Sequence, residues 1–199
     1  MKNNHQKITA KTKNRLSRNA VAIILVLVFV FVYIFSHRAE DVASSFGATG
    51  LNYLNGEYYR WFTCLFLHYN PGHLLANSAA LLSVGSLLGS FLKKKQSLFL
   101  FLSCGILAEI AYSLVVSDQI YDIGASSGVF ALIACLIVCC LRFQGQFHFI
   151  WYRPDVVIVF VYFIFANTSV TAFLVHTFGF AFGILISSVM IWTGRIHMR

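Results

Sequence analysis

The residue best placed for nucleophilic chemistry is a serine at the start of an apolar run. Ser126 stands in Gly124-Ala125-Ser126-Ser127-Gly128, where a long apolar segment that predicts a helix begins. At a helix start, free backbone N–H groups and the positive end of the helix dipole converge. An attacking serine and its developing oxyanion require such an environment. Ser126 is therefore a candidate nucleophile.

His176 is the candidate general base. Gly179 and Gly183 follow it at spacings of three and seven residues, which puts a flat ridge on the histidine's face of a helix. Small side chains let helices approach closely in lipid. The segment that begins at Ser126 carries a matching ridge of small residues, namely Ser127, Ala131 and Cys135. Packing of the two ridges predicts that Ser126 and His176 come within hydrogen-bond reach, as a nucleophile and its base.

Further polar residues surround another predicted helix start. His73 and Asn77 are four residues apart and therefore share one helix face. His68 lies five residues before His73, in the preceding loop. Polar groups in hydrocarbon are costly, so each is a candidate functional residue. None of these residues predicts an active site alone. The prediction rests on their convergence, because Ser126, His176 and the pair of His73 and Asn77 lie near the starts of three predicted helices, at one depth in the membrane.

Composition places these residues in a membrane protein. Of the 199 residues, 58% are hydrophobic and 11% are charged, and the mean hydropathy is +0.74. A soluble domain of this size could not bury so much apolar surface. A spanning helix needs roughly 17 to 25 mostly apolar residues. We therefore predict an all-α, polytopic membrane helix bundle of six transmembrane helices, at residues 20–36, 71–91, 97–116, 126–141, 155–168 and 171–192.

Membrane topology explains the net charge of +8. With a cytoplasmic N-terminus, every Lys and Arg except Arg38 and Arg60 falls on the cytoplasmic side, as the positive-inside rule requires. Both termini are then cytoplasmic, and no nucleic-acid partner is expected. The first apolar stretch is followed by His37-Arg38 without a small-residue cleavage site, which indicates an uncleaved anchor. The predicted division is a basic leader at 1–19, a membrane domain at 20–192 and a short tail at 193–199.

The helix predicted at 126–141 is short for a bilayer. Its length is roughly 24 Å at about 1.5 Å per residue, against a hydrocarbon core of about 30 Å. Ser126 should therefore lie several ångströms below the outer surface. If Ser126 acts in hydrolysis it needs water, so we expect a cavity through which water reaches it.

The connection between residues 37 and 70 is rich in aromatic residues, which is typical of the membrane interface. Within it, Glu57 and Arg60 are three residues apart, and either pair with each other or make ordinary surface contacts. Asn70-Pro71 and Arg153-Pro154 predict helix starts. The five cysteines lack paired metal spacing, so we expect them to pack in the core and expect neither a metal nor a cofactor.

Four motifs in chain order resemble those of the rhomboid intramembrane proteases. They are Glu57-Tyr58-Tyr59-Arg60 with Thr63; His68, His73 and Asn77; Gly124-Ala125-Ser126; and His176 with Gly179 and Gly183. The resemblance covers residues 57–183, and the order of the four motifs makes it specific.

The resemblance implies an intramembrane serine endopeptidase, a hydrolase with a Ser126-His176 dyad and no acidic third member. It implies that His73, Asn77 and the Ser126 backbone N–H bind the oxyanion. It also implies that Phe130, where the family commonly has Tyr, lies beneath the catalytic histidine.

The same resemblance implies how substrates enter. The helix at 155–168 and the loop at 167–173 would form a lateral gate in the lipid bilayer. The substrates would be single-pass membrane proteins, cut near the outer face after a small residue. The protein would be a multi-pass protein of the bacterial plasma membrane.

Three alternatives stay open. Ser127 stands where the family usually has Gly, so a register shifted by one residue would make Ser127 the nucleophile. The chain could instead be a catalytically inactive relative that binds transmembrane segments. Glu109 matches no family motif and is interpreted as a structural residue that forms hydrogen bonds across helices; a proton path through it would instead indicate a small transporter.

Overall fold

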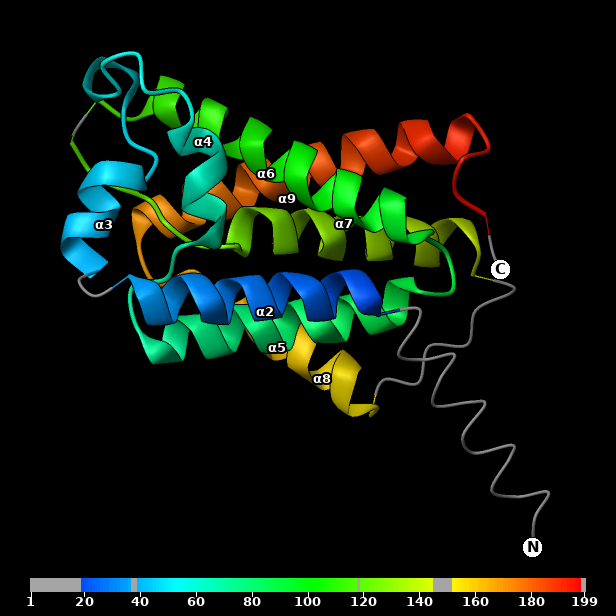
Figure 1. Cartoon of the computed structure of the whole chain (residues 1–199). Helices are drawn as coiled ribbons and strands as arrows, with labels where there is room; N and C mark the ends of the chain where they lie inside the picture. Colours follow the sequence, from blue (N-terminus) through cyan, green and yellow to red (C-terminus); the bar gives the residue numbers. More distant parts are fainter. Residues whose placement is uncertain (1–18, 37–38, 118, 145–151, 198–199) are drawn as a thin grey trace, which may run out of the picture.

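The described part of the chain is a bundle of long helices. The computed structural model describes residues 19–36, 39–117, 119–144 and 152–197. Six of its helices coincide with the six apolar stretches, and the predicted all-α bundle is confirmed (Figure 1). They are α2 (Ala20–Phe35), α5 (Pro71–Leu88), α6 (Lys94–Val115), α7 (Ser126–Arg142), α8 (Pro154–Phe165) and α9 (Val170–Trp192).

These helices differ in their capacity to cross a membrane. By length and composition, α6 and α9 are able to span a bilayer, whereas α2, α7 and α8 are shorter apolar helices. Six crossings therefore stay a prediction, as does the division into leader, membrane domain and tail. The basic residues of the leader, Arg38 and Arg199 lie outside the described residues.

Local sequence explains where the helices begin. The Asn70 side chain caps α5 by accepting a hydrogen bond from the His73 backbone N–H at 2.8 Å, with Pro71 at the first position. Pro154 likewise opens α8. Both predicted proline starts are confirmed. The Ser169 side chain caps α9 by accepting from the Ala172 N–H at 3.1 Å.

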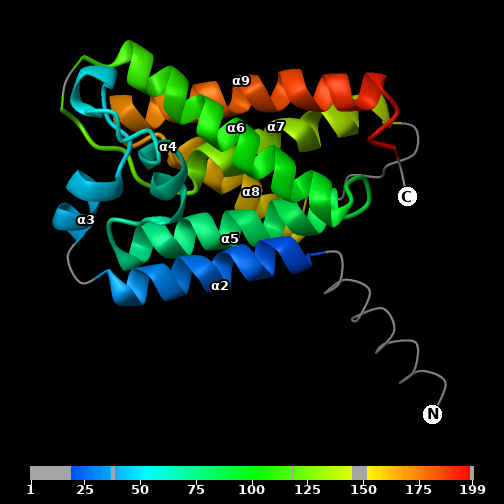
Figure 2. The same cartoon turned by 45° about the horizontal axis from the view of Figure 1, so that its top comes forward.

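The short elements gather at one end of the bundle. α3 (Ala39–Phe46), η1 (Leu51–Tyr53), α4 (Arg60–Thr63) and η2 (Cys64–Phe66) form the connection between α2 and α5. Both views place α3 and α4 at the end where α5, α7 and α9 begin (Figures 1 and 2). An isolated β-bridge between Ala48 and Asp122 ties this connection to the residues before α7.

α7 is the buried centre of the bundle, and α9 lies against it through small residues. Most side chains of α7 are buried. A Cβ atom on Gly183 would lie 2.6 Å from the Ala131 carbonyl oxygen, and one on Gly179 would overlap the Ser127 backbone. The two ridges seen in the sequence therefore meet, and they bring the starts of α7 and α9 together.

α8 lies at the periphery. It buries Asp155, Val156 and Val159, while Phe160 and Phe165 are 65% and 72% exposed. It packs mainly against α5, and Phe163 also contacts Phe130 of α7 and Phe180 of α9. The helix therefore lies at the edge of the bundle.

Candidate active site

A cavity of about 650 Å³ joins the starts of α5, α7 and α9. Ser126, His73 and His176 all line it, together with Tyr162 of α8 and residues of the α8–α9 loop. The bundle thus brings three of the predicted site residues to one space. Since they come from three different helices, the helix packing described above is what assembles them.

Ser126 and Ser127 are neighbours in the sequence but occupy different environments. Ser126 is the first residue of α7, lines the cavity and is 7% exposed. Ser127 is fully buried beneath Gly179 and does not line the cavity. Its hydroxyl makes no hydrogen bond with a described residue. Of the two hydroxyls, the one on Ser126 is therefore accessible to a molecule in the cavity.

The His176 ring is held by two contacts. It stacks on Phe130 with ring centroids 4.1 Å apart and planes 7° from parallel. Its Nδ1 lies 2.7 Å from Oδ1 of Asn167 in the α8–α9 loop. The hydrogen bond of His176 is thus with Asn167 rather than with Ser126. Ser126 and His176 face the same cavity without a hydrogen bond between them, and hydrogen bonds of this kind often form only when a substrate is bound.

His73 stands beside the turn that carries Ser126 because Gly124 leaves room for its ring. A Cβ on Gly124 would lie 2.9 Å from Nε2 of His73, and the glycine has a φ of +147°, which disfavours other residues. Nδ1 of His73 accepts a long hydrogen bond of 3.5 Å from the Tyr69 backbone N–H. With Nδ1 as the acceptor, Nε2 carries the proton of the neutral ring. A donor therefore lies beside the turn that carries Ser126.

Asn77 is placed differently from the expectation. It is fully buried and does not line the cavity. Its Nδ2 donates to the His73 carbonyl at 3.2 Å, and its Oδ1 accepts from the Tyr162 hydroxyl at 2.6 Å. Asn77 therefore joins α5 to α8, with Tyr162 between it and the cavity.

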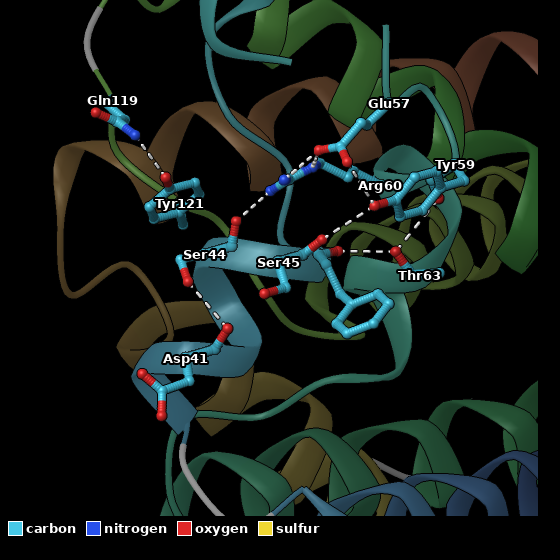
Figure 3. A network of polar contacts seen from close by, with 10 residues as sticks. Asp41, Ser44, Ser45, Glu57, Tyr59, Arg60, Thr63, Gln119 and Tyr121 are labelled. Carbon is cyan, nitrogen blue, oxygen red and sulfur yellow. Dashed lines mark hydrogen bonds and ion pairs between the residues drawn. The ribbon is translucent and has the colours of Figure 1, made fainter. Parts of the chain in front are cut away.

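Glu57 and Arg60 form an ion pair away from the cavity, so one of the two interpretations of this pair is confirmed (Figure 3). The Nε of Arg60 donates to Glu57 at 2.8 Å, and a second guanidinium nitrogen donates to the Ser44 carbonyl of α3. The Arg60 hydrogen bond lowers the pKa of Glu57. Thr63 donates to the Phe46 carbonyl at 2.8 Å. This motif therefore connects α4 to α3.

Glu109 is sealed inside the bundle. It has no exposed surface, does not line the cavity and faces the Ser127 hydroxyl. The two groups do not reach hydrogen-bond geometry, and neither carboxyl oxygen has a partner among the described residues. The hydrogen bond expected for Glu109 is therefore absent, and its burial is consistent with a structural position.

Three titratable groups lie in the loops around the cavity. Burial and then His73 lower the pKa of His68 to about 3, so this histidine is neutral. Burial and then Asp122 raise the pKa of Tyr69 to about 12, and its hydroxyl donates to the Tyr121 carbonyl. Burial raises the pKa of Asp122 to about 7. Asp122 lines the cavity and is the carboxyl closest to Ser126 in the sequence.

Sequence reasoning missed the roles of Tyr162 and Asn167. Tyr162 had a signal, because a phenol hydroxyl within an apolar segment needs a partner. Asn167 had a weaker one, since asparagine is common in loops. Its contact with His176 depends on the path of the α8–α9 loop, which the sequence pattern does not specify.

Comparison with known proteins identifies a family. The family model described as Rhomboid domain matches residues 55–193, which is more than half of the chain. The match begins just before Glu57, includes each cavity residue named above and leaves α2 and α3 outside. No curated protein matches the chain.

Proposed function

The chain belongs to the rhomboid family, and on this premise we propose that it is an intramembrane serine endopeptidase with Ser126 as nucleophile and His176 as base. The family places it in a membrane, where its substrates are membrane proteins. The observation that carries the proposal is the shared cavity, where Ser126 and His176 meet beside His73. The environment of Ser127 supports Ser126 as the nucleophile, because the Ser127 hydroxyl is buried away from that space.

The chemistry follows from the side chains present. The Ser126 hydroxyl attacks the scissile carbonyl while His176 takes the hydroxyl proton. The resulting oxyanion is stabilised by N–H donors, for which Nε2 of His73 and the Ser126 backbone N–H at the α7 start are the candidates. His176 then donates its proton to the leaving amine. A water molecule that enters the cavity then attacks the acyl-enzyme while His176 takes its proton. His176 returns the proton to the Ser126 oxygen as the acyl group leaves.

Substrate entry is proposed between α5 and α8. α8 is peripheral, and the α8–α9 loop forms part of the cavity wall. A transmembrane segment that arrives from the lipid would separate α8 from α5 and extend into the cavity. The substrates would be single-pass proteins cut near the outer face after a small residue. Bacterial origin, cytoplasmic termini and an outward-facing site complete the proposal.

A fluorophosphonate probe tests the nucleophile directly. The activated serine oxygen displaces fluoride from phosphorus and remains phosphonylated, so mass spectrometry identifies the labelled residue. We expect label on Ser126 in the wild type and in Ser127→Ala, and none in Ser126→Ala. Label on Ser127 would move the nucleophile by one residue.

The second candidate is an inactive relative that binds transmembrane segments. It is favoured by the absence of a hydrogen bond from His176 to Ser126 and by the engagement of Asn77 with Tyr162. This candidate predicts a wild-type protein that takes up no fluorophosphonate and still retains a single-pass protein in a pull-down from liposomes.

A further inference from the structure

We infer that Asn167 is a positioning residue for the general base: its side-chain oxygen accepts the Nδ1 proton of His176 and so orients the ring toward Ser126. The inference rests on the proposed protease function and adds a third member to the dyad. It starts from the 2.7 Å contact between Asn167 Oδ1 and His176 Nδ1.

The contact selects one tautomer of the imidazole. A carboxamide oxygen only accepts hydrogen bonds, so the Nδ1 that faces it must carry the proton. In the neutral ring, the lone pair then lies on Nε2. A general base needs a lone pair on the nitrogen that faces the nucleophile. Asn167 thus fulfils the orienting part of the acidic residue in a Ser-His-Asp triad.

Stacking on Phe130 does not provide this selection alone. Two parallel rings 4.1 Å apart fix the plane of the imidazole. A half-turn of the ring about the Cβ–Cγ bond keeps the ring plane, and so keeps the stacking on Phe130. The same half-turn exchanges the positions of Nδ1 and Cδ2. The hydrogen bond to Asn167 distinguishes the two orientations, so Phe130 and Asn167 together define where Nε2 lies.

A neutral acceptor suits this location. His176 is 5% exposed and lies among apolar helices. Asn167 itself is exposed, so a carboxylate in its place would remain largely hydrated and could accept the same proton. The native carboxamide accepts the Nδ1 proton without bringing a charge to the buried ring.

The position of Asn167 links the base to substrate entry. Asn167 follows the end of α8, in the loop whose Thr168 and Ser169 line the cavity. Motion of α8 away from α5 would move the same segment that holds His176. The base is therefore oriented when the loop is in place and released when the loop is displaced.

The test compares two substitutions at Asn167 in the full-length protein reconstituted in liposomes. Asn167 is exposed, so its replacement removes little packing. Asn167→Leu removes the acceptor, and Asn167→Asp keeps an oxygen that only accepts. We expect Asn167→Leu to lower kcat about tenfold with little change in KM, and Asn167→Asp to remain within about threefold of wild type.

Thr177→Val is the matched control, because it changes an exposed hydroxyl on α9 that donates to the Phe173 carbonyl. It should leave kcat unchanged. If Asn167→Leu keeps the wild-type kcat, the inference is overturned. Equal loss in Asn167→Asp and Asn167→Leu would also overturn it, because the carboxamide would then act through its N–H group.

A second readout is independent of catalysis. In protein with 15N-labelled histidine, the nitrogen shifts of His176 report which ring nitrogen carries the proton. We expect the Nδ1–H tautomer in the wild type and its loss in Asn167→Leu. A wild type with the Nε2–H tautomer would overturn the inference, whereas an inactive wild type with the Nδ1–H tautomer would count against the proposed function alone.

Discussion

At the scale of single residues, the site depends on contacts that select one orientation of each polar group. Gly124 admits the His73 ring, and Phe130 and Asn167 hold the His176 ring. Asn77 is held in the same way, but by α8 and away from the cavity. The hydrogen bond from the Tyr162 hydroxyl to Asn77 therefore links α8 to the part of α5 that also carries His73.

Tyr162→Phe should ease the entry of substrates between α5 and α8 and slightly lower the stability of the fold. The change keeps the aromatic ring against Phe130 but removes the donor to Asn77, whose Oδ1 is then buried without a partner. We expect the free energy of unfolding to fall by about 1–3 kcal/mol. Cleavage of a single-pass substrate should rise by up to about fivefold, because α8 is held less firmly.

The measurement is denaturant unfolding in detergent together with cleavage rates in liposomes. Tyr53→Phe is the matched control, because Tyr53 is exposed and lies in the connection between α2 and α5. It should change neither the stability nor the cleavage rate. A lower stability with an unchanged or slower cleavage rate would show that the bond has no part in gating.

At the scale of elements, the packing of α9 on α7 sets the distance between Ser126 and His176, the proposed nucleophile and base. Gly183 sits so close to α7 that a side chain would meet backbone atoms, which cannot move aside as a flexible side chain does. Because helices α7 and α9 are stiff, a wider separation at Gly183 would also increase the distance between Ser126 and His176.

Gly183→Ala should therefore impair both folding and activity. The added methyl group would lie 2.6 Å from the Ala131 carbonyl oxygen, so the helices must move apart. We expect a loss of about 1–3 kcal/mol in unfolding free energy, typical of overpacking. Activity per folded molecule should fall at least about tenfold, since small displacements of catalytic groups are costly.

Leu185→Ala on the same helix is the control, because Leu185 is 60% exposed and should tolerate truncation. Thermal unfolding and cleavage assays on both variants decide the matter. A Gly183→Ala protein with wild-type stability would contradict the close approach of α7 and α9.

The elements themselves were largely predictable, and the reasons are physical. Apolar runs must form helices in lipid, and prolines after Asn70 and Arg153 mark their starts. The glycine spacing after His176 predicted the α7–α9 contact. The ends were less accurate: the helix expected at 71–91 stops at Leu88 and the one expected at 155–168 stops at Phe165.

The missing part of the prediction concerns contacts across loops. Asn167, Tyr162 and Asp122 reach the site through loop paths and rotamers, which one-dimensional patterns do not encode. The family resemblance also implied that Asn77 is an oxyanion donor. Helix periodicity correctly placed it near His73 but gave no information on the hydroxyl from α8 that engages it.

At the scale of the whole molecule, Asp122 joins the connection between α2 and α5 to the bundle. Asp122 and Ala48 exchange two backbone hydrogen bonds, one in each direction. The Asp122 side chain lines the cavity. Burial raises the pKa of this carboxyl from 3.8 to about 7. The folded protein therefore holds a proton that the unfolded chain releases between these two values.

This shift predicts a pH-dependent difference between wild type and Asp122→Asn. Between about pH 4 and pH 7 the folded state binds more protons, so the Asp122 contribution to stability falls as pH rises. The variant lacks this loss and should gain stability relative to wild type over that window. The lowered pKa of His68 has no contribution from Asp122, so the effect of this histidine is the same in both proteins and cancels in the difference.

Thermal unfolding at pH 5 and pH 8 measures this difference. We expect the melting temperature of Asp122→Asn minus that of wild type to rise by several degrees between the two values. A constant difference for Asp122→Asn would contradict the burial of its carboxyl.

The most direct test of the account is cleavage of a single-pass membrane substrate by the purified protein in liposomes. Ser126→Ala and His176→Ala should each lower the rate at least about a thousandfold, because the two residues act as a unit. Ser127→Ala should retain most of the activity, since its hydroxyl lies outside the cavity. Cleavage at the wild-type rate by Ser126→Ala or by His176→Ala would contradict the proposed mechanism.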